Sequence, residues 1–546
     1  MHDVVVVGAG AGGPVVAKEL AARGLDVLLL EAGPAWTDIE HQWSHDENTA
    51  NNPATGIFRF GPSDRTQPPW PRDLAQNSFI WQTAGVGGST VHYFGNSPRA
   101  MPDALAGELT YRDLIPYYEW VEHTLPVQTA AMGTKEELFL RAATKAGLPT
   151  QSSKDISGPA CRPQQNAILQ PHGTAGRTSD AKRLVYPRAK GCTFCGHCPQ
   201  GCFLPLKAPR NLKAKRSTHV SYVPMALTAD RWTRGKAATL VADAFAVKIE
   251  TAGGVARGVT WRNTRTGVLT TEEAKAVVLA AGPIETPRLW LNSGLPNPGD
   301  EVGRGLTDHY LDFVVGRFAH YTGSSKGPTS AARADFPGHG SIEQAGVGPG
   351  LQAQGLTDSE EPGRRLHGAR LARFLSNVDR LMSIAVITDD DVVPENRVTL
   401  SSAMTADTHG PVARIELRRR TARTLANRDF LAARAAEILR AAGAREIVRM
   451  NWAPVLLHIH STMRIGPVLT ADAESRWVER LFVADNSALP NALGGPNPTL
   501  TTQALATRTA ERIFIRYFGG EPWVGRESPV SSIDDTVTAA VLTRGL

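Results

Sequence analysis

A glycine-rich segment near the N-terminus has the spacing that binds the phosphates of a dinucleotide. Gly8, Gly10 and Gly13 directly follow four consecutive valines, and a second apolar stretch at residues 27–30 leads into Glu31. In this pattern the first glycine makes a tight turn, the second lets the backbone approach a pyrophosphate, and the third lets a helix pack closely on a strand. An acid after the second strand can accept hydrogen bonds from ribose hydroxyls. The segment predicts a dinucleotide site, and Glu31 argues against a 2′-phosphate on the ligand.

A run of cysteines is the second group of residues that could do chemistry. Four of the five cysteines fall in one segment, GCTFCGHCPQGC, as Cys192, Cys195, Cys198 and Cys202. A disulfide framework would be spread over a chain of this length. The first three cysteines have the spacing of a bacterial iron–sulfur run, although Phe203 stands where such a run has proline. From the residues alone, zinc, a redox disulfide and free thiols remain open.

The elements that must position these residues alternate between strands and helices. Residues 4–7 and 27–30 are expected strands on either side of a helix at about residues 14–23. Two further apolar strands begin at Val277 and Leu481, and the second delivers Asp485 at its end, the usual place for a ligand contact in an open α/β sheet. A helix is expected after the GGPNPT turn, where its first N–H groups can face a ligand.

Length, composition and charge describe an ordinary globular protein of two or more domains. The chain has 546 residues, of which 42% are hydrophobic and 21% charged. The formal charge is +6, but basic and acidic residues are balanced locally, so we expect no nucleic-acid partner. No apolar run approaches the roughly 20 residues that span a bilayer, and no leader segment is visible. We expect a cytoplasmic protein, or one exported only with a partner subunit.

Four further segments, taken with the N-terminal one, resemble the glucose–methanol–choline (GMC) oxidoreductase family. They read TAGVGGSTVHYFG at residues 83–95, VVLAAGPIETPRLWLNSG at 277–294, VGRGLTDH at 302–309 and LFVADNSALPNALGGPNPTLTTQAL at 481–505. The resemblance covers nearly the whole chain and is weakest across residues 320–380. It implies that FAD is the cofactor and that the reaction is the oxidation of an alcohol, with the flavin accepting the hydride.

The resemblance also implies a catalytic pair. The stretch HIHSTMRIG at residues 458–466 places His458 at the position of the family's catalytic histidine, and Asn497 matches a second position that is His or Asn. Histidine is the natural base for a hydroxyl proton, and an amide can hold an alkoxide-like oxygen. This sequence departs from the family pattern with Ser461 in place of glycine and with a second histidine, His460. In an extended segment His460 would face the same pocket and could compete for the role of base.

The remaining cofactor contacts are implied by the same motifs. They are Gly87, Gly88, His92, Asp485 and Pro498, in addition to the N-terminal glycines and Glu31. In some members of the family a histidine at the place of His92 is bonded covalently to the flavin, whereas others hold FAD without a bond. The resemblance therefore allows either a covalent bond from His92 to FAD or a non-covalent contact.

The cysteine run gains an interpretation from the resemblance. Flavin subunits of some sugar and gluconate dehydrogenases in this family carry a cysteine-rich iron–sulfur loop. Cys192, Cys198 and Cys202 have the spacing of a set that binds a three-iron cluster there, with Cys195 as an extra residue or as a fourth ligand. Such a cluster would send electrons to a quinone or an acceptor protein rather than to oxygen. Nearby basic residues could dock an acidic electron carrier, or form a solvated face: Arg188, Lys190, Lys207, Arg210, Lys213, Lys215 and Arg216.

We expect an α/β protein with a discontinuous, Rossmann-like FAD-binding domain and an α+β substrate-binding domain. The FAD-binding domain takes residues 1–98, 220–310 and 455–525, and the substrate-binding domain takes 311–454. Residues 99–219 hold an aromatic-rich segment and the cysteine insertion, and 526–546 form a C-terminal tail. A helix with a core-facing stripe (Leu431, Ala435, Ile438, Ala442) is expected in the substrate-binding domain. Residues 322–363, rich in Gly, Ser and Pro, are expected to form a long loop that could cover the pocket.

The sequence thus predicts FAD-dependent oxidation of an alcohol group in a sugar, a polyol or a related small molecule, with electrons passed to a non-oxygen acceptor. An oxidase that uses oxygen is the nearest alternative, and a lyase with structural FAD is a more distant one. A flavoprotein that only binds its ligand is the weakest alternative.

Overall fold

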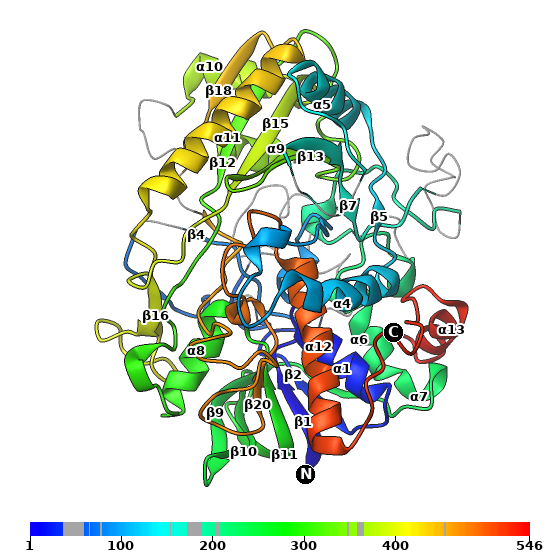
Figure 1. Cartoon of the computed structure of the whole chain (residues 1–546), viewed down its shortest axis with the longest axis vertical. Coiled ribbons are helices and arrows are strands. Elements are labelled where there is room, and N and C mark those ends of the chain that lie inside the picture. The colour runs from blue at the N-terminus through cyan, green and yellow to red at the C-terminus, as the bar shows by residue number, and fades with distance from the viewer. Residues whose placement is uncertain are drawn as a thin grey trace.

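The structure is a computed structural model that describes most of the chain. The described residues are 1–35, 59–64, 66–76, 79–152, 154, 156, 158–171, 188–202, 208–346, 349–357, 365–452 and 455–546. The helices are α1 (Gly13–Ala21), α4 (Tyr111–Thr124), α5 (Thr134–Lys145), α6 (Tyr222–Leu227), α7 (Ala229–Trp232), α8 (Gly282–Asn292), α9 (Pro349–Thr357), α10 (Gly368–Leu375), α11 (Ala422–Ala441), α12 (Thr499–Phe518) and α13 (Asp535–Thr543). Two sheets, at opposite ends of the molecule in Figure 1, organise these helices.

The first sheet joins a parallel nucleotide-binding core to an antiparallel meander. Its parallel part has the strand order β8–β2–β1–β11–β20, and β10 and β9 continue from the first half of β11. The strands are β1 (His2–Val7), β2 (Val27–Leu30), β8 (Thr239–Val241), β9 (Ala244–Ala252), β10 (Val255–Asn263), β11 (Leu269–Leu279) and β20 (Leu481–Val483). The four valines of β1 are buried, and α1 packs against α12 and α6. The predicted strand–helix–strand unit is confirmed, as are the strands before residues 280 and 485.

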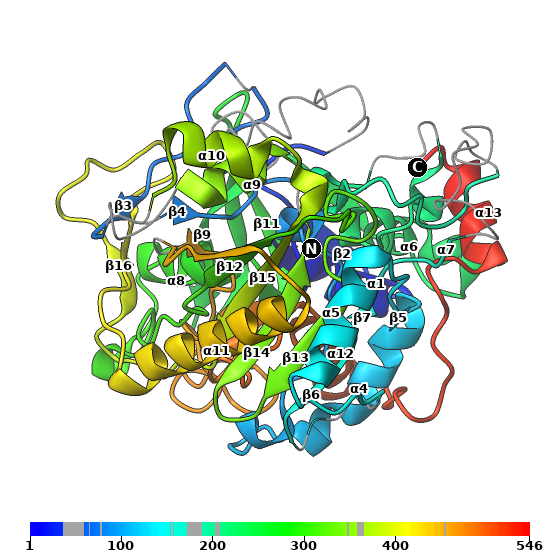
Figure 2. The same cartoon turned by 90° about the horizontal axis from the view of Figure 1, so that it is seen from above.

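The second sheet is antiparallel throughout, with the strand order β18–β12–β15–β14–β13–β6. Its strands are β6 (Ala160–Pro163), β12 (Asp312–Arg317), β13 (Ala332–Phe336), β14 (Gly340–Ala345), β15 (Leu381–Thr388) and β18 (Glu446–Arg449). Figure 2 shows α11 lying across one face of this sheet. There the predicted stripe of Leu431, Ala435 and Ile438 packs in one core with Val314 and Ile384. Since side chains alternate along strands, the opposite face is left for other contacts.

The prediction of a long loop over residues 322–363 is wrong for the described part of that range. It contains β13, β14 and α9. These strands carry few apolar residues because one face of each is charged: Arg333 forms an ion pair with Asp335, and both side chains are fully buried. The other face contributes Ala334 and Ile342 to the core under α11. Because buried charges pair with one another on one face, these strands lack the apolar pattern from which a buried strand is usually predicted.

The C-terminal tail folds back on the chain itself. Val537 and Val541 of α13 pack against Met225 of α6, and Arg544 forms an ion pair with Asp230 of α7. Figure 1 shows the C-terminus beside these helices. Within the described ranges, the longest helices lack the apolar stretch that would let one cross a lipid bilayer.

Candidate active site

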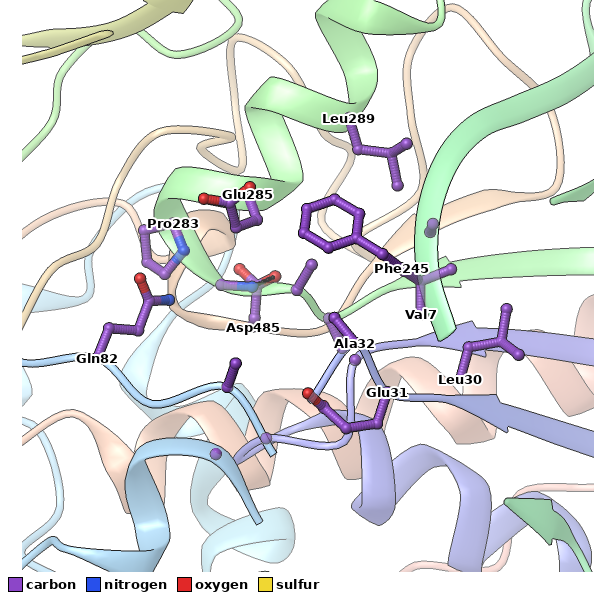
Figure 3. Close-up of a pocket in the computed structure, with 18 of the residues that line it drawn as sticks. Val7, Leu30, Glu31, Ala32, Gln82, Phe245, Pro283, Glu285, Leu289 and Asp485 are labelled. Atoms are coloured by element: carbon purple, nitrogen blue, oxygen red, sulfur yellow. Dashed lines mark hydrogen bonds between the residues drawn. The ribbon is translucent and has the colours of Figure 1, made fainter. Parts of the chain in front are cut away.

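One cavity lies at the carboxyl ends of the parallel strands, where an open α/β sheet binds its ligand. It is lined by residues that directly follow β1, β2, β11 and β20, among them Gly8, Glu31, Ala281 and Asp485. Figure 3 shows Glu31, Asp485, Gln82 and Phe245 around this space. We call it the cofactor cavity. The predicted positions Gly10 and Gly88 also line it.

The predicted glycines have two distinct roles in this cavity. A Cβ on Gly13 would lie 1.9 Å from the Gly8 carbonyl oxygen, so only glycine allows α1 to begin so close to the turn. A Cβ on Gly10 would meet nothing within 4 Å, because Gly10 faces the open cavity. The loop of Gly87 and Gly88 packs on the same turn, and a Cβ on Gly88 would lie 2.8 Å from the Gly10 Cα. The closely packed backbone around Gly13 and Gly88 and the open space at Gly10 together leave room for a pyrophosphate against the main chain.

Two buried carboxylates fix the turns around the cofactor cavity. Glu31 accepts hydrogen bonds from the backbone N–H groups of Ala9, Gly33 and Gly85, at 2.8, 2.9 and 2.9 Å. Burial raises the pKa of Glu31, and these backbone donors oppose that rise. A carboxylate with two oxygens has further acceptor positions, so the donors leave room for ribose hydroxyls.

Asp485 plays the corresponding part at the end of β20. It accepts from the Gly282 N–H at 2.9 Å, the Thr286 hydroxyl at 2.6 Å and the Ser487 N–H at 2.7 Å. It thereby joins the start of α8 to the segment that leads toward α12. Burial raises the pKa of Asp485, and its hydrogen bonds oppose the rise. The open space at Gly10 and the two carboxylates at strand ends together fit an adenine dinucleotide such as FAD.

A second cavity adjoins the first. The two share Ala11, Gln82, Ser89, Pro283 and Asn486 in their linings. The second cavity, with an empty volume of about 1530 Å³, is also lined by the predicted residues His92, His458, Asn497 and Pro498. We call it the substrate cavity. Pro498 and Thr499 bring the start of α12 to it, and no side chain caps that helix. Its first N–H groups are therefore available to a ligand.

His458 is held by a histidine behind it. The Nδ1 atoms of His309 and His458 are 2.9 Å apart, and His309 Nε2 lies 3.1 Å from the Ala492 carbonyl oxygen. A carbonyl only accepts, so in a neutral His309 the proton is on Nε2 and Nδ1 carries a lone pair. His458 must then donate from Nδ1, which leaves the lone pair on its Nε2. Asp308 completes the support by accepting from the His458 backbone N–H at 2.9 Å.

Asn497 stands on the free side of His458. Its Nδ2 lies 3.5 Å from His458 Nε2, longer than a good hydrogen bond, and its Oδ1 is buried without a partner. A hydroxyl placed between the two could donate to His458 Nε2 and accept from Asn497 Nδ2. The structure therefore brings the predicted pair together in a geometry suited to an alcohol.

The other two predicted histidines have different surroundings. His460 is fully buried, its ring packs edge-on against His309 at 5.5 Å between centroids, and it is not among the described residues that line the substrate cavity. His92 does line that cavity, and its Nδ1 lies 2.9 Å from the Thr83 hydroxyl. Thr83 in turn lines the cofactor cavity. His92 thus sits where the two cavities meet.

Burial keeps all these imidazoles neutral. It lowers the pKa of His309 to about 4 and that of His92 to about 3. It also lowers the pKa of His458 and His460 well below the ordinary value, and in both the neighbouring His309 adds to the effect. A neutral imidazole with a directed lone pair is the form that accepts a proton.

The structure gives no support to the iron–sulfur prediction. Among the described residues, which include the whole cysteine run, no three His, Cys, Asp or Glu side chains are arranged to hold a metal ion. Cys192, Cys198 and Cys202 instead pack with Ile168 and Phe194 in a small apolar cluster. Burial raises the pKa of Cys195 to about 12 and raises those of Cys192 and Cys202.

The basic residues near the cysteine run do not form a single docking face. Lys213, Lys215 and Arg216 are buried, so for these three the predicted exposed role is wrong. Lys215 Nζ donates to the carbonyl oxygens of Val91, Tyr93 and Cys198 at 2.7, 2.8 and 2.6 Å. The amine therefore ties the cysteine loop to the segment that carries His92. Lys207 lies outside the described residues.

Two supporting residues were missed by the sequence analysis. His309 and Asp308 end the segment VGRGLTDH, which was read only as a family signature. A histidine next to an aspartate at the end of a glycine-rich turn was the available signal. Their contact with His458 joins residues far apart in the chain, which no local pattern reveals.

Comparisons with known proteins agree with this architecture. Two models of the GMC oxidoreductase family match residues 162–311 and 393–506, and an NAD(P)-binding Rossmann-like domain matches residues 6–68. The chain is 28% identical to 2-methyl-1,2-propanediol dehydrogenase of Mycolicibacterium austroafricanum, covering 94% of this chain and 95% of that protein. It is 27% identical to 6'''-hydroxyparomomycin C oxidase of Streptomyces lividus, covering 94% and 91%.

A solved structure shows the same fold. Pyridoxine 4-oxidase from Mesorbium loti aligns with a TM-score of 0.66 at 16% identity, covering 95% of this chain and all of that one. The Rossmann-like core, the two family regions and the full-length relatives together place the chain: it belongs to the GMC oxidoreductase family.

Proposed function

We propose that this protein oxidises a small alcohol to a carbonyl compound with bound FAD as the hydride acceptor. The observation that carries the proposal is the placement of His458 Nε2 and Asn497 Nδ2 on one cavity that opens into the cofactor cavity. The named activities of the relatives, a 2-methyl-1,2-propanediol dehydrogenase and a 6'''-hydroxyparomomycin C oxidase, support an alcohol or sugar substrate.

The cofactor would be held by the turns at the strand ends. The backbone at Gly8, Gly10 and Gly13 and the start of α1 would bind the pyrophosphate, and Glu31 the ribose. Gly87 and Gly88 would brace that turn, while Asp485 and Pro498 would position the approach to α12. When bound, FAD supplies the hydride acceptor. His92 lies between the two cavities; a covalent bond from it to the flavin would survive acid precipitation of the protein.

The protein groups act on the hydroxyl end of the substrate. His458 Nε2 takes the hydroxyl proton as the carbon–hydrogen bond breaks, because His309 has fixed its lone pair toward the cavity. Asn497 Nδ2–H donates to the oxygen as negative charge develops there. Among the described residues, the ring nitrogens of His458 contact His309 and Asn497 rather than a carboxylate, so proton transfer and hydride transfer are expected to be closely coupled.

A non-oxygen electron acceptor remains part of the proposal because one relative is named a dehydrogenase. The proposal includes no iron–sulfur cluster as a path for the electrons. Quinone analogues and a cytochrome would reoxidise the reduced protein, whereas air would do so slowly. Rapid formation of hydrogen peroxide with substrate would overturn this part of the proposal and favour the oxidase.

The experiment is anaerobic titration of the FAD-loaded protein with alcohols while the flavin absorbance is followed. Bleaching, with one carbonyl product formed per flavin, is the expected result. A flavin that no alcohol bleaches, in a protein that still converts a cyanohydrin, would favour a lyase and overturn the proposal. Adding a quinone analogue and then air to the bleached protein distinguishes the two acceptors in the same sample.

A further inference from the structure

We propose that Asn96 and Glu343 form a second polar subsite in the substrate cavity, which binds a hydroxyl group remote from the carbon that is oxidised. The inference rests on the proposed function and names its substrate class: an alcohol in which an apolar segment separates two hydroxyl groups. Both residues line the substrate cavity, and each side chain is only 2% exposed.

The side-chain oxygen of Asn96 has no hydrogen-bond partner among the described residues. Its Nδ2 donates to Glu343 Oε2 at 2.7 Å, and because a carboxylate only accepts, this bond fixes which way the amide faces. Its Oδ1 is then a buried acceptor without a hydrogen-bond partner among the described residues. Leaving such a group unpaired in the protein interior is unfavourable, and a hydroxyl of the substrate would supply the missing donor.

Glu343 provides further acceptor capacity at the same place. Its Oε1 accepts from Gln164 Nε2 at 3.3 Å, and Arg333 NH1 lies 3.6 Å from that oxygen. The two carboxylate oxygens together can accept about four hydrogen bonds, and Asn96, Gln164 and Arg333 are three partners. The carboxylate therefore keeps acceptor capacity for a ligand. An amide oxygen beside a carboxylate selects a group that donates. A substrate carboxylate, which only accepts, would meet repulsion here.

Apolar side chains of the second sheet lie beside this subsite in the substrate cavity. Glu343 of β14 pairs with Ala385 of β15, which pairs in turn with Phe313 of β12. Two strand spacings, roughly 10 Å, are crossed on that path. The Phe313 ring then packs against Trp452 at 4.9 Å between centroids. Ala385, Phe313 and Trp452 line the same cavity as His458, so this cavity offers apolar side chains to a substrate that contacts both polar groups.

The other polar pair on this sheet face is already satisfied. Ser383 donates to Gln352 Oε1 at 3.1 Å, and both line the substrate cavity. Neither side chain has a buried atom without a partner among those described. The pair therefore offers a matched control within the same cavity.

The test compares terminal diols with mono-alcohols of the same length, using hexanediol against hexanol and octanediol against octanol. With the FAD-loaded enzyme we expect kcat/KM to favour the diols by about tenfold or more, since a hydrogen bond to a charged group adds at least one factor of ten. Asn96→Leu should remove the preference through a higher KM for the diol, while Ser383→Ala should preserve it.

Equal rates for diol and mono-alcohol in the wild type, or the same ratio in Asn96→Leu, would overturn the subsite while leaving the proposed function intact. Failure of every alcohol to bleach the flavin would overturn both. Should Asn96→Leu lose bound flavin, Glu343→Gln provides the second variant, because it keeps the shape but weakens the acceptor. A mono-ol bearing a terminal carboxylate, hydroxyhexanoate, should be the poorest substrate of the series.

Discussion

The two cavities that meet at Ala11, Ser89 and Asn486 are built in different ways. The cofactor cavity is walled mainly by turns at the ends of parallel strands, so its chemistry is that of backbone N–H groups and open space. The substrate cavity is walled largely by side chains from one face of an antiparallel sheet, with Phe313, Glu343 and others brought onto one surface by strand pairing. The backbone turns of the cofactor cavity suit one constant ligand, whereas single side-chain substitutions can change the lining of the substrate cavity.

Glycine variants in the cofactor cavity give the largest expected effect. Gly13→Ala places a Cβ 1.9 Å from the Gly8 carbonyl oxygen, so α1 must shift, and we expect a loss of more than about 3 kcal/mol in the free energy of unfolding. Gly10→Ala should keep the wild-type free energy of unfolding because its Cβ meets open space, yet weaken FAD binding. Thermal unfolding and flavin content measure both. Equal destabilisation by the two variants would break the distinction between packing and ligand-facing glycines.

Removing the amide of Asn497 tests the junction of the cavities. Asn497→Leu should lower kcat by about 10²–10³ with flavin content unchanged, because a donor to the developing oxyanion is lost. Asn497→His, which offers a ring N–H at the same place, should recover much of the rate. A change in KM alone, with kcat retained, would show that Asn497 only binds the substrate.

His309 acts through His458, and its variants separate positioning from structure. His309→Leu leaves the His458 Nδ1–H without an acceptor and frees the ring to change tautomer. An unpaired buried donor costs about 1–3 kcal/mol, so kcat/KM should fall roughly tenfold to a hundredfold. His309→Gln can still accept from His458 and donate to Ala492, and is expected to restore most of the activity. Equal loss in both variants at full flavin content would contradict the tautomer assignment.

The pH dependence of kcat/KM is the mildest of these tests. Burial lowers the pKa of His458, so its neutral form persists as pH falls, and activity is lost only when pH drops through that lowered value. The acid limb is therefore expected below the ordinary histidine value of 6.5. An inflection at or above that value would mean that His458 is more exposed to solvent in the working enzyme.

The same contrast explains what the sequence could predict. Gly8, Gly10, Gly13, Glu31 and Asp485 belong to short contiguous motifs, and the last residues of the parallel strands before them are apolar. These elements were predicted at nearly their observed bounds. Local order is sufficient there because the backbone itself forms the cavity.

Beyond His92, His458, Asn497 and Pro498, the residues of the substrate cavity escaped prediction because they are dispersed along the chain. Glu343 lies in a stretch that looked like a loop, since its strands bury charges in mutual pairs rather than apolar side chains. His309 and His458 lie in segments that are far apart in the sequence, and they are joined by a contact between their Nδ1 atoms. The iron–sulfur interpretation rested on contiguous spacing, and the described cysteines, three of which pack into an apolar cluster, give it no support.

The most direct test of the account is anaerobic reduction of the bound flavin by an alcohol in the wild type and in His458→Gln. His339→Gln serves as the histidine control, since His339, in the turn between β13 and β14, stacks on Phe430 of α11 and lines neither cavity among the described residues. We predict that His458→Gln retains its flavin and reduces it about 10²–10⁴ times more slowly, while the control matches the wild type. Wild-type rates in His458→Gln would contradict the assignment of His458 as the base.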